Sequence, residues 1–358
     1  MKISFFDDEP ELYPLQYGGK ARTIINLANE FMKHPDVESV SVLSRSIFTD
    51  KDEFELNGVR YVKLDDSNTI EKIVSEANNT DILNIHCCSF TFPFLKCKAK
   101  KIYFMHDVLI ATADKGSHLD KSLGGYFDYV MAPSLFAKSI YEKYRKIING
   151  VVPCEVIPRH INTDLFFIPN DSCPIDFLNT IKKKYDEVFF FPSRPIAEKG
   201  RKYLIEFANS ILNKNICIIG PFGDMSDLPL NCFDTGWIES ENLKYYYSIS
   251  SVTLNFSTLP ESFSQVCIES VCCGCPVVAF AVGNVTDLGK ITNAIKLCDR
   301  NLESIKKTVD EALILKRNNN QFSLEAKKLL DLFSKDVIID QYINFYKKIL
   351  KDGENYEK

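Results

Sequence analysis

One stretch in the second half of this 358-residue chain shows how that half folds. Its sequence is Pro260-Glu261-Ser262-Phe263-Ser264-Gln265-Val266-Cys267-Ile268-Glu269-Ser270, followed by Cys273-Gly274-Cys275-Pro276-Val277-Val278-Ala279. The pattern predicts a strand that ends near residue 256, a loop to residue 261, a helix over residues 265–273, a Gly-Cys-Pro turn and another buried strand. A helix that joins two such strands is typical of a parallel sheet covered by helices.

The start of this helix is a candidate binding site for a phosphate or a sugar hydroxyl, because the amides of Phe263, Ser264 and Gln265 should lie unpaired there. Glu261 lies at the rim of this site, and Glu269 lies deeper along the helix. Ionised carboxylates only accept hydrogen bonds, which suits vicinal hydroxyls, so the pair can hold a sugar and a ribose at once. Taken alone, the two acids are better explained as a helix-start acid favoured by the macrodipole and an ordinary surface residue.

The same alternation of short apolar runs and helical patterns continues along the chain. The predicted strands are residues 3–6, 39–43, 82–86, 101–105, 129–132, 155–157, 188–191, 216–219, 232–234, 252–256 and 277–280. The predicted helices include residues 21–32, 70–78, 137–146, 203–212, 243–249 and 265–273, and residues 302–350 are nearly all helical in pattern. Alternation of this kind indicates an α/β protein with doubly wound parallel sheets.

A polar, turn-rich stretch over residues 162–171, which contains Pro169, separates two series of such elements. We therefore predict a first domain over residues 1–165 and a second over residues 166–333. Two doubly wound sheets in series place a ligand cleft at the carboxyl ends of their strands.

Composition excludes several classes of protein. A net charge of -5 and a pI near 5.7 are not those of a dedicated nucleic-acid binder. Apolar residues make up 45% of the chain, so its whole length can pack. No apolar run is long enough for a signal peptide or a membrane span, so we expect a cytoplasmic protein. Its 12 cysteines should then be thiols rather than disulfides.

A second loop carries two cations. Its sequence, after the first strand of the second domain, is Pro192-Ser193-Arg194-Pro195-Ile196-Ala197-Glu198-Lys199-Gly200. Arg194 and Lys199 at a strand end suit a diphosphate leaving group, whose negative charge grows as its bond breaks. Loop charges in solvent explain the same two residues equally well.

Two features of the first domain can face a ligand. Gly18-Gly19-Lys20 precedes a helix, and two glycines let the backbone approach a phosphate or a sugar closely, although a simple turn is a common alternative. His106 directly follows a predicted strand. Without further signals, a histidine there is more often a structural residue.

Three other clusters are better explained by packing or by solvation. Four cysteines over residues 267–275 lack paired C-x-x-C spacing, so we expect core thiols rather than a zinc site. We expect Asp7-Asp8-Glu9 and Asp65-Asp66 to lie in solvated loops. The basic, aromatic helix over residues 137–146 is expected to be a solvated face, with peripheral contact to an anionic membrane at its inner face as the alternative.

Residues 261–279 resemble the E-x7-E signature of the retaining GT-B glycosyltransferases, in particular glycosyltransferase family 4, whose usual form is E-G-F-G-x-x-x-x-E-A-x-A-x-G-x-P-V-V-A. The resemblance implies two Rossmann-like domains that face each other across a cleft, with a last helix over residues 334–358 that returns to the first domain. It also implies that Glu261 contacts the donor sugar and Glu269 the ribose. Ser262 and Ser264 stand where the family generally has glycine, a change that would narrow the donor pocket.

The resemblance covers nearly the whole chain. Residues 192–200 look like the family's G-R-x-x-x-x-K-G element, with Ser193 in place of the first glycine. Gly18-Gly19 matches the family's glycine-rich first loop, and a histidine at the position of His106 reaches the donor sugar in this family. In an element that looks like I-P-N-G-x-D, Arg159 and His160 replace the asparagine and the glycine, so the local geometry there can differ.

These matches imply a glycosyltransferase that moves a sugar from a UDP- or GDP-sugar to a hydroxyl of a glycan, a lipid-linked or a small-molecule acceptor. The transfer would retain the anomeric configuration and need no metal or other cofactor. The catalytic residues would be His106, Arg194, Lys199 and Glu261. The donor site would consist of Gly18, Gly19, Ser193, Arg194, Lys199, Glu261, Phe263, Ser264, Gln265 and Glu269. The first-domain loops at residues 8–17 and 108–119 would hold the acceptor. A sugar-nucleotide epimerase and a non-catalytic sugar-nucleotide-binding subunit are the alternatives.

Overall fold

The computed structural model describes residues 1–7, 18–45, 47, 51–64, 69–86, 97–106, 127–148, 152–170 and 172–354. The chain divides into two compact units, of which unit 1 comprises Met1–His160 and Lys335–Lys358 and unit 2 comprises Ile161–Ser334. The sequence analysis placed these boundaries after residues 165 and 333. The loops predicted to hold the acceptor lie outside the described residues.

Unit 1 is built on an eight-stranded sheet with the order β3-β4-β2-β1-β5-β6-β7-β8. Its strands are β1 (Lys2–Asp7), β2 (Ser39–Ser44), β3 (Glu53–Leu56), β4 (Val59–Lys63), β5 (Ile82–Ile85), β6 (Lys100–Phe104), β7 (Tyr129–Ala132) and β8 (Cys154–Val156). All neighbouring strands are parallel except β3 and β4.

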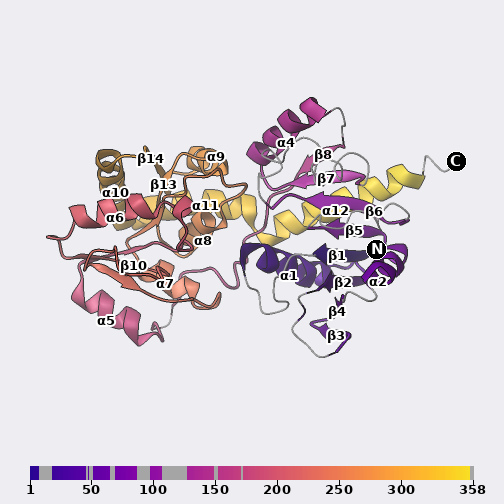
Figure 1. Ribbon diagram of the computed structural model, residues 1–358, viewed down its shortest axis with the longest axis horizontal. Helices are drawn as coiled ribbons and strands as arrows, with labels where there is room; N and C mark the ends of the chain where they lie inside the picture. The colour runs from indigo at the N-terminus through magenta and orange to yellow at the C-terminus, as the bar shows by residue number, and fades with distance from the viewer. Residues whose placement is uncertain are drawn as a thin grey trace. The chain divides into compact units, whose positions relative to one another are not determined.

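Among the described residues, four helices cover the two faces of this sheet. Helices α1 (Gly18–Lys33) and α12 (Lys335–Glu354, yellow in Figure 1) pack on one face, and α2 (Thr69–Asn78) and α4 (Leu135–Ile148) pack on the other. The side chains of β1 alternate accordingly, since Phe5 packs in the layer with α1 and α12 whereas Phe6 packs in the opposite layer. Phe31 of α1 meets Tyr342 and Tyr346 of α12 edge to face, with ring centroids 5.7 and 5.8 Å apart.

Unit 2 has a six-stranded sheet with the order β11-β10-β9-β12-β13-β14, in which every neighbouring pair is parallel. Its strands are β9 (Glu187–Phe190), β10 (Ile216–Gly220), β11 (Cys232–Asp234), β12 (Val252–Asn255), β13 (Val277–Phe280) and β14 (Ile295–Cys298). Its helices are α5 (Asp176–Lys184), η3 (Ala197–Lys199), α6 (Arg201–Ser210), α7 (Leu243–Ile249), α8 (Gln265–Cys272), α9 (Asn284–Ile291), α10 (Leu302–Arg317) and α11 (Asn319–Phe333). Helices α6 and α10 line one face of the sheet, and α5, α7, α8, α9 and α11 line the other.

The predicted doubly wound α/β fold is confirmed. Each predicted strand matches an observed strand to within one residue at either end. Strands β3, β4 and β14 and helices α5 and α9 were not predicted. Both sheets reverse their strand order beside their first strand, between β1 and β5 in unit 1 and between β9 and β12 in unit 2. In open α/β sheets this reversal point is where ligands bind.

Candidate functional site

The loops that follow β9 and β12 carry most of the predicted donor-site residues of unit 2. Because β9 and β12 are parallel neighbours, both loops leave the same edge of the sheet at the reversal point. They are also tied together, since the amide and the hydroxyl of Thr258 donate to the carbonyl of Glu198, at 2.8 and 3.0 Å. The structure therefore brings the cation loop and the acidic loop side by side.

Lys199 and Glu261 form an ion pair between these loops, with the lysine Nζ 2.5 Å from Oε1 of the carboxylate. The side chains are only 27% and 16% exposed. Burial alone would raise the pKa of Glu261, but the charge of Lys199 and hydrogen bonds from Lys199, Ser264 and Ser257 outweigh it and lower that pKa. Glu261 is therefore ionised at neutral pH.

Two glycines allow the backbone of this site to pack closely. Gly200 has a left-handed φ of 84°, and a Cβ there would lie 2.0 Å from the carbonyl oxygen of Phe256. Gly283, at the start of α9, lies so close to Glu261 that a Cβ would be 2.5 Å from its carbonyl oxygen. The amide of Asn284 donates to that same carbonyl at 3.0 Å. The loop around Glu261 is thus fixed from both sides.

The start of α8 lies directly after Glu261. Ser264 precedes the helix with φ 63° and ψ 62°, and Gln265 is the first helical residue. The ring of Phe263 is buried against Phe333, with the centroids 5.5 Å apart, so only the backbone of Phe263 is available to a ligand. The arrangement presents helix N-terminal amides beside a carboxylate and a lysine, which together suit a phosphorylated sugar.

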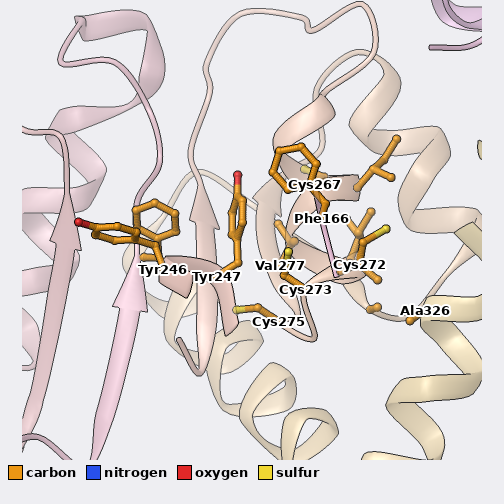
Figure 2. Packing of buried hydrophobic residues seen from close by; sticks show 14 of the residues in the cluster. Phe166, Tyr246, Tyr247, Cys267, Cys272, Cys273, Cys275, Val277 and Ala326 are labelled. Atoms are coloured by element: carbon orange, nitrogen blue, oxygen red, sulfur yellow. The ribbon is translucent and has the colours of Figure 1, made fainter. Parts of the chain in front are cut away.

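Glu269 lies in α8 and is buried, with 1% of its surface exposed. Its Oε2 accepts a hydrogen bond from the hydroxyl of Tyr247 at 3.3 Å, and Tyr247 is shown in Figure 2. The explanation of Glu269 as an ordinary surface residue is therefore wrong. A carboxylate held this deep in α8 is costly unless it is hydrogen-bonded, which favours a specific role.

Arg194 differs from Lys199 because its side chain is exposed. No hydrogen bond or ion pair joins its guanidinium to the described residues. The neighbouring Ser193 is buried, with 6% exposed. The structure therefore leaves one cation of the loop unpaired at the carboxyl edge of the sheet.

The histidine predicted in unit 1 belongs to a chain of hydrogen bonds. Nη2 of Arg159 lies 3.0 Å from Nδ1 of His106, and Nε2 of His106 lies 2.5 Å from Nδ1 of His86. A guanidinium can only donate, so His106 accepts at Nδ1 and donates from Nε2 to His86. Burial, followed by the nearby charges of Arg159 and Lys20, lowers the pKa of both rings well below its ordinary value. Both rings are therefore neutral at pH 7.

These hydrogen bonds bear on the predicted contact of His106 with a donor sugar. Both of its ring nitrogens already have partners within unit 1, so its contact with a donor sugar stays a prediction. Arg159 was noted from the sequence only as a departure from the family pattern, and its position beside His106 was not predicted. The sequence did carry one sign that Arg159 is special, because it places a cation where the resembled family has an asparagine.

Asp7 is not in a solvated loop, and that expectation is wrong. It is the last residue of β1, is fully buried, and pairs with Nζ of Lys20 at 2.8 Å. Gly18 and Gly19 form the first turn of α1 directly before this lysine. Asp8, Glu9 and Asp65-Asp66 lie outside the described residues. At the reversal point of unit 1, a buried ion pair therefore lies at the end of β1, and His86 directly follows β5.

The four clustered cysteines, predicted to be core thiols, are buried. The cysteines of residues 267–275 are free thiols in the core of unit 2, and Figure 2 shows them around Val277. Burial raises the pKa of Cys267 and of Cys272 to about 12. In the basic helix over residues 137–146, Tyr141 packs inside unit 1. In the described ranges no three His, Cys, Asp or Glu side chains are arranged as metal ligands, and no helix has the length and apolar character of a membrane span.

The whole chain is similar to solved GT-B structures. Sucrose-phosphate synthase from Thermosynechococcus elongatus matches with a TM-score of 0.77 at 16% identity, over 98% of this chain and 99% of that one. Anabaena HepE in complex with UDP and glucose matches with a TM-score of 0.73 at 16% identity, over 97% and 100%. A glycosyltransferase from Rickettsia africae ESF-5 matches with a TM-score of 0.73 at 18% identity, over 98% of each chain. The chain therefore has the GT-B fold.

The family follows from the sequence of unit 2. Residues 176–329, which form most of that unit, match the family model described as glycosyl transferases group 1. The match is consistent with a group 1 glycosyltransferase, and the resemblance seen in the E-x7-E segment is confirmed. A comparison with curated proteins gave no significant match.

Proposed function

We propose that this chain transfers a sugar from a UDP-sugar to an acceptor hydroxyl, with retention of configuration and without a metal. The observation that carries the proposal is the arrangement at the carboxyl edge of unit 2. An ionised Glu261, its partner Lys199, an unpaired Arg194 and the start of α8 lie on two loops that are tied together. UDP is proposed as the nucleotide because HepE, which shares the fold, is described in complex with UDP and glucose.

In this proposal, binding of the donor exchanges the ion pair. Hydroxyls of the sugar donate to Glu261, and the diphosphate takes Lys199 as a partner together with Arg194 and the amides of α8. The bond between the anomeric carbon and the phosphate oxygen then breaks, and the cations stabilise the charge that develops on the diphosphate. The acceptor oxygen bonds the anomeric carbon, and its proton passes to the departing phosphate oxygen. Glu269 would accept from the ribose hydroxyls.

The test is a screen of donors followed by three variants. Purified protein is incubated with UDP-, GDP-, ADP- and dTDP-sugars and a panel of sugar and lipid-linked acceptors, and release of the nucleotide is measured. We expect UDP release that depends on an acceptor, survives EDTA, and falls about 100-fold or more in Glu269→Ala, Arg194→Ala and Lys199→Ala. NMR of the product reports whether the configuration is retained.

Other results would support the alternatives. A sugar that changes in the absence of any acceptor indicates an epimerase. Tight binding of a donor with no turnover under any acceptor indicates a non-catalytic subunit. Turnover that persists in all three variants would contradict the proposed site.

A further inference from the structure

A chain of hydrogen bonds runs along the carboxyl ends of neighbouring strands in unit 1. Arg159 comes shortly after the edge strand β8, His106 comes shortly after β6, and His86 directly follows β5. Strand β7 lies between β6 and β8, so the side chain of Arg159 spans the width of a strand to reach His106. Its Nη2 lies 3.0 Å from Nδ1 of the ring and also donates to the backbone carbonyl of His106 at 3.2 Å. These two bonds hold the guanidinium against both the ring and the backbone of His106.

The chemistry of Arg159 decides which nitrogen of His106 carries the proton. A guanidinium has no acceptor, so Nδ1 of His106 offers its lone pair and the ring proton lies on Nε2. Nε2 of His106 is 2.5 Å from Nδ1 of His86, which then accepts and carries its own proton on Nε2. The direction of both bonds between side chains therefore follows from the residue at one end of the chain.

The other end of the chain of hydrogen bonds gives no opposing preference. His86 is 3% exposed and packs against the rings of Phe5 and Phe104, with ring centroids 5.6 and 4.5 Å away. Its Nε2 is buried and has no hydrogen-bond partner among the described residues. Since the two phenyl rings have no polar atom, neither of them selects a tautomer of His86. The orientation of the chain is thus set from Arg159.

The charged groups near His106 also disfavour a second proton on its ring. Lys20 of α1, which is paired with Asp7, and Arg159 are cations close enough to act on both His106 and His86. His106 itself is only half-buried, so a ligand can reach it. Such a ligand meets a neutral imidazole whose Nδ1 is occupied and whose Nε2–H donates.

We infer that Arg159 is a positioning residue that makes His106 a hydrogen-bond donor, through its Nε2–H, toward the donor sugar. The inference rests on the proposed function for its catalytic consequence, because contact of His106 with the donor sugar belongs to the same assignment. An oxygen of the sugar would take the Nε2–H from His86 while Nδ1 stays bonded to the guanidinium. His106 is then not the base for the acceptor hydroxyl, in agreement with transfer of that proton to the departing phosphate oxygen.

Three substitutions change what the side chain at position 159 offers to Nδ1 of His106. Arg159→Lys keeps a group that only donates, Arg159→Gln supplies an amide that donates or accepts, and Arg159→Glu supplies a carboxylate that only accepts. We expect the ring proton to stay on Nε2 in the lysine variant, to divide between the two nitrogens in the glutamine variant, and to lie on Nδ1 in the glutamate variant. Lys138→Glu is the matched control, because it reverses a charge in unit 1 at a lysine of α4 that pairs with Glu142.

The first measurement is nitrogen NMR of protein labelled at histidine, at mildly alkaline pH, which distinguishes a protonated ring nitrogen from a bare one. His106→Gln and His86→Gln assign the signals. His34 is an internal reference, because its Nδ1 accepts from the amide of Asp36 at 3.2 Å, and its unchanged signals report that unit 1 is folded. A proton on Nδ1 of His106 in the wild type overturns the inference. So does the wild-type pattern in whichever of the glutamine and glutamate variants of Arg159 is folded.

The second measurement is kcat/KM with the donor found in the screen. Loss of the Nε2–H donor should lower it by about tenfold in Arg159→Glu, whereas Arg159→Lys should stay within about threefold of the wild type. Wild-type kcat/KM in Arg159→Glu would mean that the position of the proton does not matter for transfer, and would overturn the catalytic part of the inference. The nitrogen NMR needs no turnover, so inactivity of the wild type with every donor contradicts the proposed function alone.

Discussion

Lys199 and Glu261 lie in a partly buried environment where each depends on the other. Removing the cation in Lys199→Met leaves a carboxylate that is 16% exposed without its main partner, so the free energy of unfolding should fall by about 1 to 3 kcal/mol. Adding Glu261→Gln to this variant should recover most of the loss, because the uncompensated charge is then gone. Urea denaturation of the wild type, both single variants and the double variant measures the coupling. Additive losses would show that the ion pair does not contribute to stability.

Arg194 should behave in the opposite way, since its side chain is exposed and makes no described ion pair. We expect Arg194→Ala to change the free energy of unfolding by less than about 0.5 kcal/mol while weakening UDP binding by about tenfold or more. Lys214→Ala is the matched control, because this exposed cation precedes β10 at the amino edge of the same sheet. Isothermal titration with UDP measures both variants. Equal losses of UDP affinity in Arg194→Ala and Lys214→Ala would indicate that UDP is attracted by positive charge in general and not by Arg194 in particular.

Single residues show how far the site could be predicted from sequence. Glu261 and Lys199 were found because the spacing of a motif survives in the sequence, whereas Asp7 was misjudged because an acidic run gives no sign of which member ends a buried strand. Arg159 lies 53 residues from His106 in sequence, and only the sheet brings them together. The left-handed φ of Ser264 and the hydrogen bond that it accepts from Asn255 cannot be read from the motif.

At the scale of elements, the turn between η3 and α6 depends on Gly200. A methyl group there would meet the carbonyl oxygen of Phe256 at 2.0 Å, so Gly200→Ala should lower the free energy of unfolding by more than about 3 kcal/mol. Gly236→Ala is a matched control, because Gly236 also has a positive φ, 60°, but no atom lies within 4 Å of the added carbon. That variant should lose only about 1 kcal/mol. Thermal melts compare the two, and similar losses would mean that the close approach at Gly200 is unimportant.

The missed strands escaped prediction for two different reasons. Strands β3 and β4 form a hairpin around Asn57-Gly58, both with positive φ, and Asn-Gly is a strong signal for such a turn. That signal was overlooked because the chain otherwise alternates strands with helices. Strand β14 has only four residues, Ile-Lys-Leu-Cys, and its middle pair is only half-buried. Strands β5, β12 and β13, whose four residues are all buried, were predicted well because burial on both faces leaves a largely apolar run.

At the scale of the molecule, the two units share one architecture but differ in the groups that lie where the strand order reverses. Each has its own apolar layers on both faces of a sheet, and each places charged or polar groups at the point where the strand order reverses. In unit 2 they include the ionised Glu261 carboxylate and the exposed side chain of Arg194. In unit 1 they include neutral, buried histidines, so the two units should respond differently to acid.

The buried histidines of unit 1 determine whether acid raises or lowers its stability. His86, His106 and His160 all lie in unit 1, are largely buried, and have a lowered pKa, which for His160 is about 4 as a result of burial. The unfolded chain binds protons to these groups near pH 6.5, whereas the folded chain does so only at lower pH. Their contribution to stability is therefore present above pH 6.5 and is lost as the pH falls toward the folded values.

For His160 alone, lowering the pH from 7.5 to 5 should cost about 2 kcal/mol of the free energy of unfolding. The single tryptophan, Trp237, lies in unit 2, so its fluorescence follows that unit while circular dichroism follows both. We expect acid to shift the dichroism transition more than the fluorescence transition. His160→Gln should remove about 2 kcal/mol of the pH dependence by dichroism and leave the fluorescence transition in place. Equal shifts of both signals in the wild type, or an unchanged pH dependence in His160→Gln, would contradict the assignment of this acid sensitivity to unit 1.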